Sequence, residues 1–213
     1  MRKLTSVALF AVAVALTPGL ASAENFYAAV RGGPGITQDT DNGFVGSPRL
    51  TDEYKVGLTG SGAFGYFFPF GLRAEAEIGF IYSPLKSEGG VDIGGSVKSY
   101  LGMVNAYYDL KLPVLGPFKP YVGFGLGAAR VNNDQQMIAP FFGGRKVDVD
   151  ETRTAFAYQG RVGVGYEFNK WFDLTLGYRY IHIDSGDIDN GGRKINFGEI
   201  RNHSAELGFA IKF

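Results

Sequence analysis

Charged residues at every second position are the strongest chemical signal in the chain. Arg73, Glu75 and Glu77 alternate with apolar residues within 72–82, a spacing that puts all three on one face of a β-strand. Five further charges fall on the polar face of other alternating segments: Arg161, Glu167, Arg179, Glu206 and Lys212. If these strands enclose a common interior, we expect opposite charges to pair there, because unpaired buried charges are costly. The alternative is a narrow ion path that opens when the pairs exchange partners.

Histidine and serine could supply nucleophilic catalysis, but their spacing in this chain argues against it. His203 and Ser204 are adjacent, so on a strand they point to opposite faces. His182 and Asp184 share a face, yet no serine accompanies them at strand spacing. We therefore predict no catalytic residues, and we interpret both histidines as ordinary residues at the rim of the fold.

No pattern in the chain predicts a cofactor or a metal. The segment 60–65, Gly-Ser-Gly-Ala-Phe-Gly, matches the dinucleotide-binding fingerprint by letter, but Tyr-Phe-Phe-Pro follows it instead of a helix. The glycines fit better as positions that relieve crowding within a strand. Cysteine is absent, and the acidic runs lack the spacing of a calcium loop. We expect neither a cofactor nor a metal site.

The same alternation of apolar and polar residues recurs along the chain and predicts an all-β fold. Eight segments show it: 26–33, 55–68, 72–82, 97–110, 121–131, 156–168, 172–183 and 204–213. Strand edges must pair, and in a bilayer every edge pairs only when the sheet closes on itself. We therefore predict an eight-stranded antiparallel transmembrane β-barrel, wound as an up-and-down meander.

The beginning of the chain and its composition indicate an exported protein. Arg2 and Lys3 precede an apolar run, and 21–23 read Ala-Ser-Ala, the form that signal peptidase cleaves. We assign 1–23 to a cleaved signal peptide and 24–213 to one barrel domain. With 21 basic and 21 acidic residues, the charge balance gives no electrostatic basis for nucleic-acid binding.

The links between the predicted strands alternate between short and long. Short links cover 69–70, 111–120 and 169–171, and four long polar links cover 34–54, 83–96, 132–153 and 184–201. Membrane barrels have this arrangement, with short periplasmic turns and long extracellular loops. A soluble eight-stranded barrel would turn its apolar face inward instead. Because charges gather on one face and the other face forms a nearly continuous apolar band, we expect the charges inside and lipid outside.

A resemblance covers the whole mature chain and rests on four stretches. They are 105–109 (Asn-Ala-Tyr-Tyr-Asp), 120–127 (Pro-Tyr-Val-Gly-Phe-Gly-Leu-Gly), 177–180 (Gly-Tyr-Arg-Tyr) and 209–213 (Phe-Ala-Ile-Lys-Phe). The chain resembles the small eight-stranded outer-membrane barrels, OmpA/OmpX-like, and the outer membrane protein β-barrel domains and porin-family surface antigens of Gram-negative bacteria. The resemblance implies that Phe209, Ile211 and Phe213 form a C-terminal signal read by the barrel-assembly machinery. Because this chain stops at the predicted barrel, we expect it to lack the peptidoglycan-binding domain of longer OmpA relatives.

The resemblance implies a location in the bacterial outer membrane, reached through the periplasm, in contact with outer-membrane lipids and lipopolysaccharide. Loops carry the function of such scaffolds. We therefore expect a non-enzymatic surface protein of the adhesin or surface-antigen type, whose loops bind a host or surface ligand. Two alternatives are a small-solute or ion pore and, third, a lipid-modifying enzyme. An eight-stranded interior is filled by side chains, so a wide diffusion pore is not expected.

Overall fold

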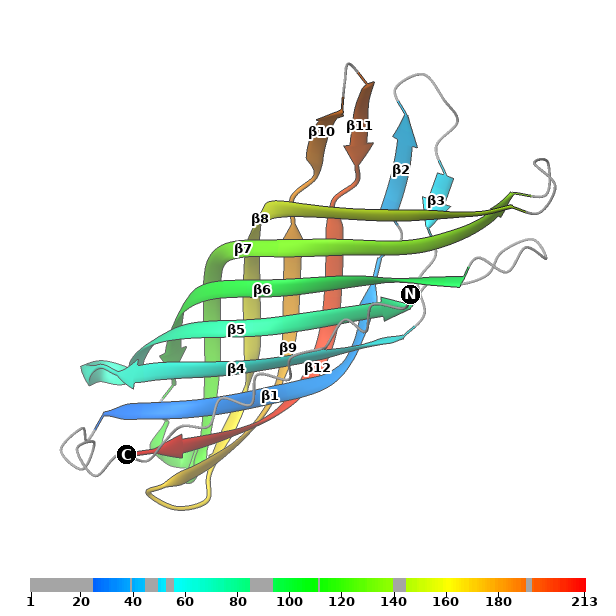
Figure 1. Ribbon diagram of the computed structural model, residues 1–213. Helices are drawn as coiled ribbons and strands as arrows, with labels where there is room; N and C mark the ends of the chain where they lie inside the picture. Colours follow the sequence, from blue (N-terminus) through cyan, green and yellow to red (C-terminus); the bar gives the residue numbers. More distant parts are fainter. Residues whose placement is uncertain are drawn as a thin grey trace.

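Eight strands close into an antiparallel barrel in which each barrel strand pairs with the next along the chain (Figure 1). The computed structural model describes residues 25–38, 40–44, 50–52, 56–84, 94–110, 112–139, 145–190 and 193–213. The barrel strands are β1 (Phe26–Thr37), β4 (Gly57–Phe67), β5 (Leu72–Pro84), β6 (Gly94–Asp109), β7 (Phe118–Ala139), β8 (Arg145–Glu167), β9 (Phe172–Ile183) and β12 (Ile200–Lys212). β1 pairs with both β4 and β12, which closes the barrel. The predicted up-and-down barrel is confirmed, and the predicted signal peptide lies outside the described residues.

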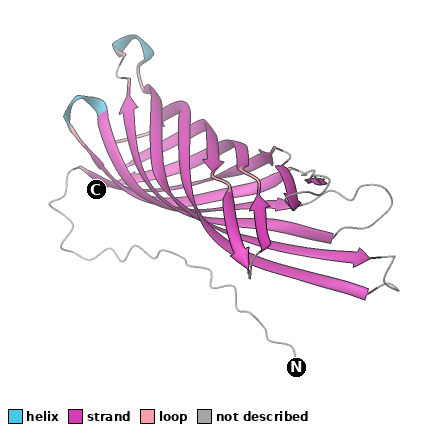
Figure 2. Cartoon of the chain, turned by 90° about the horizontal axis from the view of Figure 1, so that it is seen from above, coloured by secondary structure: helices cyan, strands magenta, loops and turns pink. Residues whose placement is uncertain are grey.

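The short connections lie at one end of the barrel. Two single turns of 3-10 helix, η2 (Pro69–Gly71) and η3 (Pro113–Leu115), are at the same end as the C-terminus (Figure 2). Gly71 has a φ of 86°, and a Cβ atom on it would lie 2.6 Å from the carbonyl oxygen of Asp109, so this turn requires glycine. In membrane barrels with this arrangement the short turns face the periplasm and the long connections face the outside of the cell, so we call the two ends periplasmic and extracellular. Among the described residues, no helix is long and apolar enough to cross a membrane.

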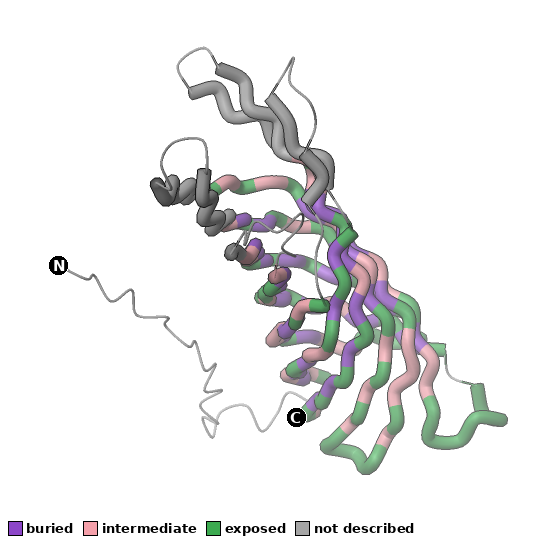
Figure 3. Tube along the Cα trace, turned by 90° about the vertical axis from the view of Figure 1, so that its right-hand side faces the viewer, coloured by how far each residue is buried: buried purple, intermediate pink, exposed green. Residues whose placement is uncertain are grey.

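Burial alternates along the barrel strands and separates a packed interior from a lipid-facing surface (Figure 3). On β5, Glu75 and Glu77 are buried, whereas Ile78 and Phe80 are exposed. Exposed apolar side chains such as Val104 recur on the outside of the other strands, and buried charges such as Arg161 and Glu206 recur in the interior. Polar residues inside and apolar residues outside are typical of a membrane barrel and opposite to a soluble one.

Four shorter strands form a second sheet beyond the barrel, within two of the segments predicted as loops. They are β2 (Thr40–Phe44), β3 (Leu50–Asp52), β10 (Gly186–Asn190) and β11 (Arg193–Phe197), in the order β10-β11-β2-β3. Figure 1 shows this sheet at the end of the barrel opposite the C-terminus. Alternation predicts a strand reliably only over about four to eight residues. These segments have three to five residues, and only β11 alternates, over Lys194 to Phe197.

The β7–β8 hairpin also extends past the barrel. These strands pair as far as Ala139 and Arg145, whereas the pairing of β8 with β9 begins only at Ala157. The predicted loop 132–153 is therefore mostly paired backbone. Together with the small sheet, the hairpin gives the extracellular side more regular structure than the sequence predicts.

Candidate functional site

A layer of buried charges crosses the interior of the barrel. Its members are four arginines and four carboxylates: Arg31, Arg73, Arg161, Arg179, Glu75, Glu77, Asp109 and Glu206. Strands β1, β5, β6, β8, β9 and β12 each contribute at least one of them. Equal numbers of opposite charges make the layer neutral, which is the condition for keeping so many ions away from water.

Glu75 is the centre of one half of this layer. Arg31 donates two hydrogen bonds to its carboxylate, from Nη2 to Oε1 at 2.5 Å and from Nη1 to Oε2 at 3.0 Å. The hydroxyl of Tyr27 donates a third hydrogen bond to Oε1, and Arg73 Nη1 lies 3.5 Å from the same oxygen. Such a two-pronged arginine–carboxylate contact is among the strongest geometries for this pair.

Arg161 is the centre of the other half. Its Nη2 donates to Glu77 Oε1 at 3.0 Å, its Nε to Glu206 Oε2 at 3.1 Å, and its Nη1 to the Tyr107 hydroxyl at 2.7 Å. Arg179 Nε lies 3.1 Å from Glu206 Oε1. None of the three guanidinium nitrogens of Arg179 makes an aligned hydrogen bond within the described residues. Arg161 is therefore the better hydrogen-bonded of the two arginines that face Glu77 and Glu206.

Aromatic rings surround Arg73 on the periplasmic side of the layer. Its guanidinium carbon lies 4.7 Å from the ring centroid of Tyr107, 5.5 Å from that of Tyr121 and 5.7 Å from that of Tyr27. Its Nε lies 2.8 Å from Asp109 Oδ2. Rings at these distances attract a cation through their faces, so they add to the contacts of Arg73 with the carboxylates of Asp109 and Glu75.

Glycines on β7 make room for the large side chains of β6. Gly123 pairs with Tyr107, and Gly125 pairs with Asn105. A Cβ atom on Gly123 would lie 2.1 Å from Cδ1 of Tyr107, and one on Gly125 would lie 1.9 Å from Oδ1 of Asn105. The alternating glycines of the predicted strand 121–131 thus set the position of the tyrosine that holds Arg161.

A second, more exposed cluster lies at the periplasmic end. Lys212 Nζ is 2.8 Å from Asp173 Oδ1 and 3.3 Å from Glu167 Oε1, and Lys119 pairs with the same Glu167. These residues and Arg73 line a cavity of about 450 Å³. The charged pairs around it are partly exposed, so they resemble ordinary surface pairs more than the buried layer does.

Six of the eight charges predicted to point inward lie in the buried layer: Arg73, Glu75, Glu77, Arg161, Arg179 and Glu206. Glu167 and Lys212 lie instead in the periplasmic cluster. The sequence analysis missed Arg31, Asp109 and Lys119 as members of these clusters. Arg31 and Asp109 follow the alternation of their strands. Counting every second residue along each strand would therefore have predicted that both side chains point into the interior.

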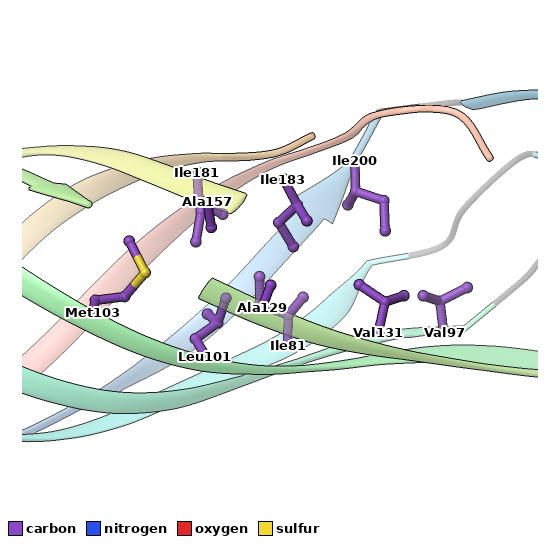
Figure 4. Close-up of a cluster of buried hydrophobic side chains, with 10 residues drawn as sticks. All are labelled: Ile81, Val97, Leu101, Met103, Ala129, Val131, Ala157, Ile181, Ile183 and Ile200. Atoms are coloured by element: carbon purple, nitrogen blue, oxygen red, sulfur yellow. The ribbon is translucent and has the colours of Figure 1, made fainter. Parts of the chain in front are cut away.

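A cluster of buried apolar side chains fills the interior on the extracellular side of the charged layer (Figure 4). Its members are Ile81, Val97, Leu101, Met103, Ala129, Val131, Ala157, Ile181, Ile183 and Ile200. Ile81 follows Glu77 along β5 toward the extracellular end, and Ile181 follows Arg179 along β9 in the same direction. This apolar layer was not predicted from the sequence.

Uncharged polar side chains complete the interior beside the apolar layer. The hydroxyls of Thr37 and Ser83 lie 2.6 Å apart, and Asn202 Nδ2 donates to Thr37 Oγ1 at 3.0 Å. All three side chains are buried. The charged layer is therefore separated from the extracellular end by side chains that carry no charge.

The histidines lie on the outer face near the extracellular end. His182 Nε2 is 3.2 Å from Asp184 Oδ1, and its ring stacks on Tyr158. His203 contacts the hydroxyl of Tyr178 through Nδ1, while Ser204 is buried in the interior. Among the described residues, no three His, Asp or Glu side chains are grouped closely enough to hold a metal ion.

The residues of the expected assembly signal lie on the outer face of β12 and at its end. Phe209 and Ile211 are exposed to the lipid side. The Phe213 ring centroid is 6.2 Å from that of Phe64, and its backbone N–H donates to the Phe26 carbonyl oxygen. Recognition of these residues by the assembly machinery stays a prediction.

Comparisons with known proteins agree with this architecture. The family model described as "Outer membrane protein beta-barrel domain" matches residues 6–213. An outer membrane protein of Gluconacetobacter diazotrophicus is 32% identical over 174 residues, which cover 73% of this chain and 46% of that protein. The chain thus spans about half the length of this relative.

Two solved structures share the fold at low sequence identity. The Neisserial surface protein A has a TM-score of 0.58 at 21% identity, with 88% of this chain and 97% of that chain covered. The outer membrane protease OmpT of Escherichia coli has a TM-score of 0.59 at 9% identity, with 90% and 98% covered. A surface protein and a protease on similar barrels show that the fold alone does not fix the activity.

Proposed function

Because the chain belongs to the outer membrane protein beta-barrel domain family, we propose that it is a closed barrel whose extracellular extensions bind a surface or host molecule. The protein lies in the bacterial outer membrane, in contact with its lipids. The proposal concerns what the barrel does there: it holds the β7–β8 hairpin and the small sheet at the cell surface.

The observation that carries this proposal is the contrast between the two ends of the barrel. The interior holds a neutral charged layer and, above it, buried uncharged side chains. The extracellular side, in contrast, carries paired strands that continue past the last β8–β9 pair at Ala157 and Ile183. A filled interior and an extended extracellular structure favour ligand binding over the passage of solutes through the barrel. Binding residues lie disproportionately on the loops and extensions of a rigid scaffold.

Shortening the β7–β8 hairpin tests the proposal. The β6–β7 pairs extend as far as Gly94 and Gln136, and Gln136 pairs with Asp148 across the hairpin. Replacing 137–147 with an Asn-Gly turn should therefore shorten the hairpin without removing a pairing partner of β6. We expect cells that express this variant to adhere to an immobilised extracellular-matrix extract no better than cells without the protein. Val114→Ser, in the periplasmic η3 turn, is the control and should adhere like the wild type. Unchanged adhesion of the shortened variant, and of a second variant that lacks 186–197, would overturn the proposal.

The filled interior also predicts that the protein does not conduct ions. An ion would have to leave the charged layer, where its counter-charges are paired, and cross buried apolar side chains that exclude water. We expect no discrete current steps from the refolded mature chain in a planar bilayer, with insertion verified by protease protection. Steps that disappear after the sample is boiled would support a pore instead and would make the buried charges its selectivity site.

A further inference from the structure

Two cations lie on the lipid-facing surface near the extracellular end. Lys98 stands on β6 between Val97 and Ser99, which are both buried in the interior, so its own side chain points outward. Arg130 stands on β7 between the buried Ala129 and Val131, and it is exposed on the same face. Arg130 pairs with Tyr100, two positions from Lys98, so the two cations are diagonal neighbours on adjacent strands.

Neither cation has an acidic partner among the residues that the structure describes. The residues directly opposite Lys98 are Tyr82 and Asn132, and those directly opposite Arg130 are Tyr100 and Thr154; none of the four carries a charge. One acidic residue, Asp134, is diagonal to Lys98 on the side away from Arg130. Arg201, another exposed cation of the outer face, differs because it pairs with Glu199. A cation that faces a bilayer without a partner is costly, so an anion from the membrane is the partner that this position favours.

An apolar cleft of about 250 Å³ adjoins Lys98. Leu58 of β4, Phe80 and Tyr82 of β5, and Tyr100 of β6 line it on the outer surface. Exposed aromatic side chains gather where a membrane meets water, which places the two cations at the level of the lipid head groups. An anionic head group at Lys98 would therefore have an apolar groove for a hydrocarbon chain directly beside it.

We propose that Lys98 and Arg130 bind a phosphate of a phosphorylated, acylated glycolipid of the outer leaflet, with one acyl chain of the same molecule in the cleft beside Lys98. A phosphate matches two neighbouring cations in charge and in hydrogen-bonding capacity. The extracellular end of the barrel meets the leaflet in which such glycolipids lie. This site is separate from the extracellular extensions, so its test and the adhesion test can fail independently.

The test measures lipid retention by the refolded protein. Wild type, Lys98→Gln, Arg130→Gln and the double variant are incubated in detergent with bisphosphorylated lipid A, and the bound fraction is measured by native mass spectrometry. A cation beside an anionic lipid surface contributes roughly a fivefold change in affinity, so we expect about fivefold loss in each single variant and about thirtyfold loss in the double variant. Arg201→Gln is the matched control and should bind like the wild type, because that cation already has a partner.

Two further lipids separate the possible sources of the phosphate. Dephosphorylated lipid A should bind the wild type as weakly as intact lipid A binds the double variant. Phosphatidylglycerol, whose phosphodiester carries a single negative charge, should bind more weakly than lipid A, and the substitutions should lower its binding by a smaller factor. Equal binding of intact lipid A to wild type and double variant would overturn the site, and equal binding of phosphatidylglycerol and lipid A would overturn the assignment to a glycolipid. Heat-dependent gel mobility confirms that each variant is folded.

Discussion

Replacing Arg161 with methionine is expected to lower the free energy of unfolding by about 3–5 kcal/mol, the usual cost of removing one partner from a buried ion pair. Arg161 donates to Glu77, Glu206 and the Tyr107 hydroxyl. Methionine fills similar space but supplies neither charge nor donors. The layer would then hold three arginines against four carboxylates, and Glu77 would lose its two aligned hydrogen bonds from Arg161.

Urea titration of the protein folded in lipid vesicles measures this loss. The chain has one tryptophan, Trp171, which lies half exposed at a periplasmic turn and reports unfolding by its fluorescence. The double variant Arg161→Met, Glu77→Gln restores a neutral layer of three and three, so it should lose less stability than Arg161→Met alone. Arg179→Met removes the same charge from the same layer but no aligned hydrogen bond, and should also cost less. Equal stability of Arg161→Met and wild type would contradict the proposed importance of the layer.

The sequence is sufficient to assign faces but not partners. Alternation puts Glu75 and Glu77 on one face of a strand, and both are buried in the interior. Their partners are Arg31 on β1 and Arg161 on β8, strands that are brought together only by the closure of the barrel. Pairing across an interior depends on strand register and tilt, which period-two alternation in a single sequence does not encode.

The apolar layer could not be predicted from the sequence for a related reason. The segments 80–82 (Phe-Ile-Tyr) and 180–183 (Tyr-Ile-His-Ile) place apolar residues on both faces, so alternation disappears where the interior itself is apolar. Ile81 and Ile181 then look like any other apolar strand residues. One signal in the extracellular segments was nevertheless available: Gly191 and Gly192 separate β10 from β11, and a Gly-Gly pair favours a two-residue hairpin.

Gly123→Val is expected to destabilise the barrel by roughly 1–3 kcal/mol, the usual cost of overpacking a filled interior. The added side chain would overlap the Tyr107 ring, since even a Cβ atom would lie 2.1 Å from its Cδ1. A displaced Tyr107 would no longer accept the hydrogen bond from Arg161 or lie beside Arg73. A substitution on β7 would therefore also remove contacts that stabilise the charged layer.

Two variants show whether the overlap with Tyr107 is the cause of this loss. Gly102→Val, on the neighbouring strand β6, is the control, because no atom lies within 4 Å of the position its Cβ atom would take; its stability should stay within about 0.5 kcal/mol of wild type. Adding Tyr107→Ala to Gly123→Val removes the ring, so the double variant should lose less stability than the sum of the two single losses. Additive losses, measured by the same urea titration, would mean that Gly123 is needed for some reason other than the position of Tyr107.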